Sequence, residues 1–213
     1  MSYEEEIVGF LSSPENLRLA LDIEEHLKNV KATLEEKFWK DLLASMGKTF
    51  LNNSSAHGVY DWQVVEPVGS NSKNKWPWIS LQPKKLIAGQ RFFCFTIQKE
   101  AGTLYGGIPL RKQNDQNYRE SFGPLFKEIP GLKELQDKLR SQNFKTPNDG
   151  WLSWKWFDES SESQILSKKN ILSLAEGADY ADLMTKNLWD MFIENREAVE
   201  RINKAILEKD GLV

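Results

Sequence analysis

The segment RFFCFTIQKEAGTLYGGI, residues 91–108, decides the fold class of this 213-residue chain. Its first eight residues are rich in aromatic and β-branched side chains and predict a strand. A turn over 100–103 contains a glycine and is followed by a second apolar run over 104–108, so the segment predicts an antiparallel hairpin. The Gly106-Gly107 pair inside the second strand indicates a bulge or the close approach of another backbone.

Three further segments have the residue pattern of strands. Over 59–65, aromatic and aliphatic residues alternate with polar residues, which is the period of a half-buried strand. A short strand is expected over 78–81 and is stopped by Pro83, and the aromatic segment 151–157 is expected to be extended. With the hairpin, these segments predict an antiparallel sheet of four to five strands.

A long helix is predicted ahead of the sheet, after a short helix over 3–11. Ser13 is a suitable N-cap and Pro14 suits the first helical position, while we expect Gly47 to cap the C-terminus and residues 52–57 to form a polar loop. Apolar residues recur on one stripe of this helix at Ala20, Ile23, Leu27, Val30, Leu34, Phe38 and Leu42. The stripe fits a coiled-coil seam, but we favour packing along the domain or against the C-terminal helix.

The second half of the chain is mainly helical in pattern. Helices are expected over 117–127, 130–142, 164–175 and 178–208. No internal repeat or low-complexity linker interrupts the chain, so a single domain over 1–213 is favoured over two. The predicted class is α+β, with an antiparallel sheet flanked by long N- and C-terminal helices.

The cysteine and histidine content excludes several kinds of site. Cys94 is the single cysteine and lies in an apolar run, so we expect a buried, inert thiol and no intrachain disulfide. His26 and His57 are the two histidines, so no metal-binding spacing exists, and no metal or other cofactor is predicted. The start of the chain lacks a signal-peptide layout and no apolar run could span a bilayer, so we expect a cytoplasmic protein without a membrane partner.

Positive charge is concentrated in the strand-rich middle of the chain. Residues 58–112 carry eight basic and three acidic side chains, whereas residues 1–57 and 156–213 have net charges of −4 and −5. Cations that neutralise phosphates, next to rings that stack on bases, predict a surface for DNA or RNA. The alternative is that the cations only protect sheet edges and the tryptophans only anchor the core. The candidate nucleic-acid-binding residues are Lys73, Lys75, Trp76, Trp78, Lys84, Lys85, Arg91, Arg111 and Lys112.

No catalytic residue is assigned from the sequence. There is no Gly-x-Ser-x-Gly elbow and no Walker A loop. A degenerate form of the carboxylate–lysine pattern of metal-dependent nucleases occurs as Asp61, Gln82 and Lys84, although Pro83 interrupts the strand and a single carboxylate is a poor metal site. A divergent metal-dependent nuclease is one alternative function, and a protein-interaction role for the acidic helices is another.

Several short aromatic motifs, taken in order, resemble the region that follows the nuclease core in a group of bacterial PD-(D/E)XK-superfamily proteins. The motifs are EKFWKDL (36–42), LYGGI (104–108), WLSWKWF (151–157) and LWDMF (188–192). The catalytic Asp and Glu-x-Lys core of that family lies upstream of this region and has no counterpart in the sequence, so no catalytic residue is carried over. The resemblance implies a non-catalytic accessory module of a defence or mobile-element system, with nucleic acid or a protein as its partner.

Overall fold

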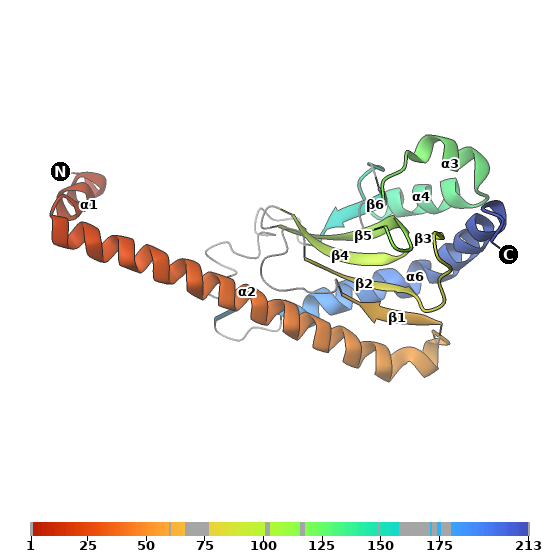
Figure 1. Cartoon of the computed structure of the whole chain (residues 1–213), viewed down its shortest axis with the longest axis horizontal. Coiled ribbons are helices and arrows are strands. Elements are labelled where there is room, and N and C mark those ends of the chain that lie inside the picture. The colour runs from red at the N-terminus through yellow and green to blue at the C-terminus, as the bar shows by residue number, and fades with distance from the viewer. Residues whose placement is uncertain are drawn as a thin grey trace.

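An antiparallel sheet of six strands lies at the centre of the molecule (Figure 1). The structure is a computed structural model that describes residues 2–59, 61–66, 77–100, 103–115, 118–148, 150–157, 171, 174–175 and 180–212. The strands are β1 (Trp62–Val65), β2 (Trp78–Pro83), β3 (Arg91–Phe93), β4 (Phe95–Glu100), β5 (Thr103–Lys112) and β6 (Trp151–Trp156). The helices are α1 (Tyr3–Leu11), α2 (Pro14–His57), α3 (Phe122–Glu128), α4 (Leu132–Ser141) and α6 (Tyr180–Lys209). The predicted α+β class, with long helices at both ends, is confirmed.

The predicted hairpin forms the middle of the sheet. β4 pairs with β5, β2 adds to the outer side of β4, and β6 pairs with the other side of β5. β3 and β4 keep one register against β5, because Phe93 faces Leu110 and Thr96 faces Gly107. Cys94 separates them opposite Pro109, which has no N–H to continue the ladder. β3 and β4 therefore act as one long, interrupted strand.

The long helix α2 begins as predicted but extends ten residues beyond Gly47. The Ser13 side chain accepts a hydrogen bond from the N–H of Asn16 at 3.2 Å, and Pro14 takes the first helical position. The helix ends at Gly58, which has the left-handed φ of 62° that a glycine cap adopts. The predicted cap at Gly47 and the predicted loop over 52–57 are therefore wrong. A glycine inside a helix costs only about 1 kcal/mol, and packing of the second half of α2 outweighs that cost.

One face of the sheet packs on α6 and on the second half of α2. From α2, Phe38, Leu42, Met46 and Phe50 enter the core. Phe192 of α6 contacts Trp62 and Phe95, with ring centroids 5.1 and 5.3 Å apart. The expectation that the stripe of the long helix packs against the domain and the C-terminal helix is therefore correct from Phe38 onward.

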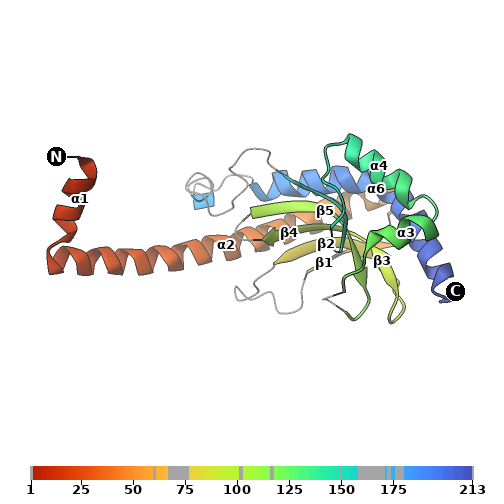
Figure 2. The same ribbon diagram turned by 90° about the horizontal axis from the view of Figure 1, so that it is seen from above.

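The first half of α2 does not pack on the domain. Figures 1 and 2 show α1 and this half of α2 extending away from the sheet as an arm. Ile23, Leu27 and Val30, which the sequence analysis placed against the domain, are each about half exposed. The packing interpretation is wrong for this half of the stripe, because the sheet is too short to reach it.

The remaining boundaries shift by a few residues. Helix α3 begins five residues later than the predicted start at 117, and β1 begins three residues later than its predicted start at 59. β2 continues through Pro83 rather than ending before it, since this proline lies at the last position of the strand. Most of the helix predicted over 164–175 lies outside the described residues. No helix in the described ranges is long and apolar enough to cross a membrane.

Candidate ligand-binding face of the sheet

The two faces of the sheet differ in what covers them. Side chains at alternate strand positions, such as Ile79, Phe95 and Ile97, belong to the apolar core shared with the helices. The intervening positions form a second surface, which we call the aromatic face. Its residues are Trp78, Ser80, Cys94, Thr96, Gln98, Tyr105, Arg111, Trp151, Trp154 and Trp156. None of these belongs to the core cluster that the described helices build.

Four aromatic side chains from β5 and β6 form the wall of this face. The ring of Tyr105 lies 5.1 Å from Trp151, 5.8 Å from Trp154 and 5.5 Å from Trp156. Tyr105 pairs directly with Trp156 across the two strands. Gly107 pairs with Trp154, and a Cβ at Gly107 would lie 2.7 Å from the Cα of that tryptophan. The predicted close backbone approach is therefore present at Gly107, whereas Gly106 lies against the ring of Phe157.

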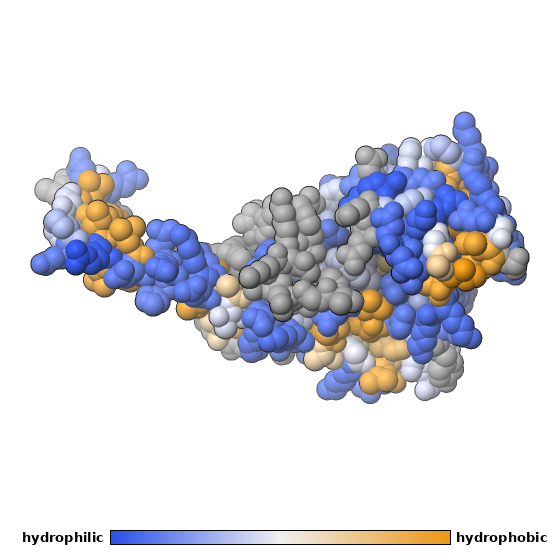
Figure 3. Space-filling view, in the orientation of Figure 1, coloured by the Kyte–Doolittle hydropathy of each residue, from blue (hydrophilic) through white to orange (hydrophobic). Residues whose placement is uncertain are grey.

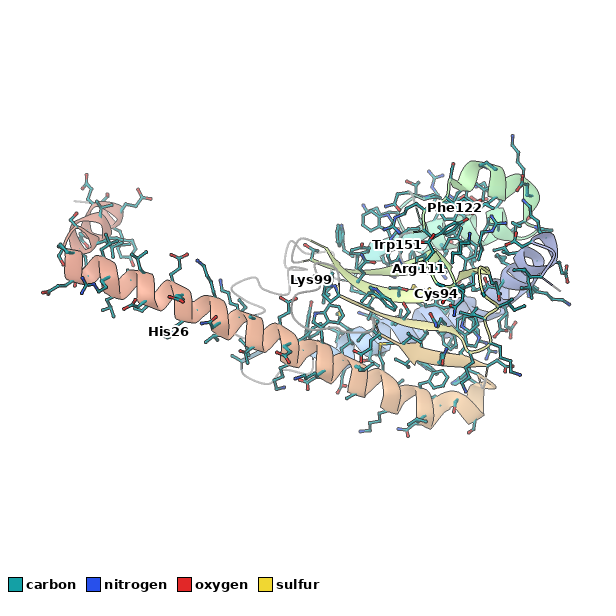
Figure 4. The ribbon with its side chains drawn as sticks, viewed as in Figure 1. His26, Cys94, Lys99, Arg111, Phe122 and Trp151 are labelled. Atoms are coloured by element: carbon teal, nitrogen blue, oxygen red, sulfur yellow. The ribbon has the colours of Figure 1, made fainter. Side chains whose placement is uncertain are left out.

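Arg111 lies across the centre of the aromatic face. Its guanidinium carbon is 5.7 Å from the ring centroid of Trp78 and 6.0 Å from that of Trp151, which is the range of cation–π contact. Its Nη2 donates to Oε1 of Gln98 over 3.5 Å. Figure 4 shows Arg111 of β5 next to Trp151 of the neighbouring strand β6 and next to Cys94, which lies between β3 and β4. Among the described residues no carboxylate pairs with this guanidinium, and the contacts recorded for it are to the neutral side chains of Gln98, Trp78 and Trp151.

The floor beneath Arg111 is polar and buried. Ser80 and Thr96 share a hydrogen bond of 2.6 Å between their hydroxyl oxygens, and each is at most 1% exposed. The Cys94 sulfur lies 3.5 Å from the Thr96 hydroxyl. Burial raises the pKa of Cys94, an effect that Arg111 and the two hydroxyls only partly offset. The thiol therefore stays protonated near neutral pH, as expected for an inert cysteine, and supplies no nucleophile.

The structure brings two of the predicted nucleic-acid-binding residues together, Trp78 and Arg111. Lys73, Lys75 and Trp76 lie outside the described residues. Lys84 and Lys85 are exposed just beyond the end of β2, at the rim of the sheet.

Arg91 and Lys112 form a separate group at the far end of the sheet. Arg91 donates to Asp210 at 2.5 Å and to Glu120 at 2.8 Å, and these carboxylates, Asp210 foremost, raise its pKa. Lys112 lies 5.5 Å from the ring centroid of Tyr118. A hollow of about 460 Å³ opens beside these residues, but its arginine is already neutralised by two carboxylates. This group stabilises the junction of β3, β5 and the end of α6.

The residues of the alternative nuclease pattern also meet at one rim of the sheet. The N–H of Lys84 donates to the carbonyl of Asp61 over 2.7 Å, and Gln82 pairs with Gln63 on the neighbouring strand. Asp61 and Lys84 are both exposed. Within the described ranges no group of three His, Cys, Asp or Glu side chains is placed to hold a metal ion. The pattern therefore lacks the second carboxylate that a nuclease site of this kind uses.

Of the residues on the aromatic face, only Trp78 and Arg111 are among the site residues predicted from the sequence. The segment 151–157 is predicted only to be extended, and in the structure Trp154 and Trp156 are half-buried and lie outside the main core. Gln98 and Tyr105 are not predicted as site residues. The available signal was the period of two along β5, which places Tyr105, Gly107 and Arg111 on one face. A comparison with protein-family models, curated proteins and solved structures finds no match to this chain.

Proposed function

We propose that this protein is a non-catalytic binding module that holds a short stretch of single-stranded DNA or RNA on its aromatic face. The observation that supports this most is the position of Arg111, between Trp78 and Trp151 and with no carboxylate partner among the described residues. A guanidinium that no described carboxylate pairs with can give its hydrogen bonds to a phosphate instead. The half-buried rings of Trp78, Trp154 and Trp156 offer stacking surfaces for unpaired bases, whereas Tyr105 and Trp151 are buried.

The ratio of rings to cations favours nucleic acid over an acidic peptide. Three half-buried tryptophans, Trp78, Trp154 and Trp156, share this face with a single arginine and with the buried rings of Tyr105 and Trp151. Planar bases gain roughly 1–3 kcal/mol each from stacking on aromatic side chains, whereas carboxylates gain nothing from these rings. An accessory role beside a nuclease, as the family resemblance implies, is consistent with a module that binds a strand and does not cleave it.

Fluorescence anisotropy with short labelled oligothymidine and oligouridine tests the proposal. We expect Trp78→Ala to weaken binding by about 5- to 150-fold, the equivalent of one stacked base, and Trp78→Phe to restore much of the loss. We expect Arg111→Gln to weaken binding by about 10- to 100-fold, since a hydrogen bond to a charged group is lost. Arg201→Gln, which removes the same charge from an exposed position on α6, serves as the matched control.

The salt dependence gives a second readout. Each neutralised phosphate of a single strand contributes a slope of about −0.7 in a plot of log affinity against log salt. We expect Arg111→Gln to reduce the slope by about that amount, and Trp78→Ala to leave it unchanged. If wild-type protein binds neither oligonucleotide, or if Trp78→Ala and Arg111→Gln both bind like wild type, the proposal is wrong. Tighter binding of a glutamate-rich peptide than of either oligonucleotide would point to a protein ligand instead.

A further inference from the structure

The N-terminal arm, residues 3–37, exposes an unusual amount of apolar surface. The first residue of α2 that is buried is Phe38, so about 24 residues of this helix, or roughly 36 Å, precede the core. Figure 3 shows apolar surface at the outer end of the arm. Ten large apolar side chains of the arm are more than 40% exposed: Tyr3, Ile7, Val8, Phe10, Leu17, Leu19, Leu21, Ile23, Leu27 and Val30. This much exposed apolar surface is typical of an interaction site.

The apolar residues of α2 in the arm form a coiled-coil seam. Ile23, Leu27, Val30 and Leu34 follow one another at steps of four, three and four residues. Ile23, Leu27 and Val30 are 50%, 51% and 52% exposed and have no partner among the described residues, whereas Leu34, next to the globular part, is half-buried. Helices in proteins gain most of their stability from packing of an apolar face, so a second helix on the seam would stabilise the arm.

The same side of α2 stays free beyond the arm. Asp41, Ala44 and Lys48 continue the side on which the seam lies, and all three are exposed. Among the described residues, these exposures leave room on this side of α2 for a second helix to run along the seam past Leu34. This space is what an antiparallel partner requires, because its own N-terminal end must pass that point.

The charges beside the seam match those of a second, antiparallel copy. Glu24 follows Ile23 and Lys31 follows Val30, so both lie on the same flank. When Leu27 of one copy faces Val30 of the other in the antiparallel sense, Glu24 of each copy lies beside Lys31 of the other. A parallel pair would instead place His26 beside Lys31 and form no attractive pair. In the single chain Glu24 pairs with Lys28 at 2.7 Å, but both side chains are at least 60% exposed and the pair is easily exchanged.

We propose that the arm is a self-association element, through which two copies of this chain pair antiparallel along Ile23, Leu27, Val30 and Leu34. The proposal is independent of the nucleic-acid role, which uses residues on the sheet. The partner of the arm is a second copy of the chain and not a membrane, because residues 2–37 carry nine acidic and four basic side chains. A net charge of −5 would repel an anionic lipid surface.

Sedimentation velocity over a range of concentrations tests the pairing. We expect wild-type protein to form dimers, and the double change Leu27→Asp with Val30→Asp to leave monomers. Glu24→Lys and Lys31→Glu should each raise the dimer dissociation constant by roughly 10- to 30-fold, because two attractive pairs become repulsive. The two changes combined should restore the wild-type value. Glu25→Lys, the same charge change on the opposite side of the helix, should have little effect.

Cysteine cross-linking distinguishes the two directions of pairing. A mixture of Leu27→Cys chains and Val30→Cys chains should form a disulfide-linked dimer under mild oxidation, more efficiently than either variant alone. Efficient cross-linking of Leu27→Cys by itself would show a parallel pair and overturn the antiparallel arrangement. A wild-type protein that stays monomeric at every concentration, or a combined charge swap that does not restore dimers, would overturn self-association. Intact oligonucleotide binding by a monomeric arm variant would leave the role of the aromatic face unaffected.

Discussion

Asn203 of α6 makes both main-chain hydrogen bonds to Phe93 that a neighbouring strand would make. Its Oδ1 accepts from the Phe93 N–H at 2.7 Å, and its Nδ2 donates to the Phe93 carbonyl at 3.0 Å. β2 ends at Pro83 and does not continue alongside β3, so this edge would otherwise leave two buried main-chain groups unpaired. One amide side chain thus protects the edge of the sheet and attaches the C-terminal helix to it.

Replacing Asn203 with alanine should destabilise the fold substantially. Both Phe93 groups would be left buried without partners, and each costs about 1–3 kcal/mol, so we expect a loss of roughly 2–4 kcal/mol in the free energy of unfolding. Urea denaturation measures the change, with Lys204→Ala on the exposed side of the same helix as the control. A loss below about 0.5 kcal/mol would mean that water satisfies these groups.

Two glycine substitutions should act in opposite directions. In Gly107→Ala the new Cβ would lie 2.2 Å from the Ser153 carbonyl oxygen, so β6 must move and stability should fall by about 1–3 kcal/mol. In Gly47→Ala, within α2, nothing lies within 4 Å of the new Cβ, so stability should rise by about 0.5–1 kcal/mol. Thermal unfolding measures both changes. Equal effects of the two substitutions would contradict the close packing of β6 on β5.

Tyr118 should make stability depend on pH in the alkaline range. Burial, and then the hydrogen bond to Glu120, raises the pKa of Tyr118 from 10.0 to about 12. Between these values the unfolded chain has released the proton and the folded chain still holds it, so the free energy of unfolding should fall as pH rises. Below pH 10 Tyr118 is protonated in both the folded and the unfolded chain, so it does not contribute to the change of stability with pH.

The comparison with Tyr118→Phe isolates this contribution. Other groups titrate in the same range, but both proteins share them. We expect the stability of wild-type protein to decline more steeply than that of the variant between pH 10 and 12. Ultraviolet absorbance of the phenolate should show one late-ionising tyrosine in wild type that is missing in the variant. If the stability of the wild-type protein and that of Tyr118→Phe fall equally with pH over this range, the prediction is wrong.

The exposed lysines at the rim should matter less than Arg111 for nucleic-acid binding. Lys84 and Lys85 are solvent-exposed, so their attraction to phosphate is screened by salt. We expect Lys84→Glu with Lys85→Glu to weaken oligonucleotide binding about 2- to 5-fold at low salt and hardly at all at high salt, measured by anisotropy. If this double variant loses binding completely and Arg111→Gln has no effect, the nucleic-acid-binding site lies at the rim and not at Arg111.

The pairing of Arg111 and Trp78 illustrates the limit of sequence reasoning. The sequence analysis placed both among nine candidates, but it did not separate Arg111 from Arg91. The two arginines differ because Asp210, 119 positions away, neutralises Arg91, whereas no described carboxylate reaches Arg111. Contacts over such separations depend on how α6 packs, and no local pattern encodes them.

The sequence by itself determined the hairpin, the start of the long helix at Ser13 and the α+β class. These features depend on interactions between residues a few positions apart, such as alternation along a strand and capping at a helix end. Only the tertiary structure decided that α2 passes through Gly47, that its first half leaves the domain and that the tryptophans of β6 line a second face. Each of these outcomes depends on burial against segments that are distant in the sequence. Where the core is within reach, this burial outweighs the local preference of the residues, and where the core is out of reach, as for the arm, it contributes nothing.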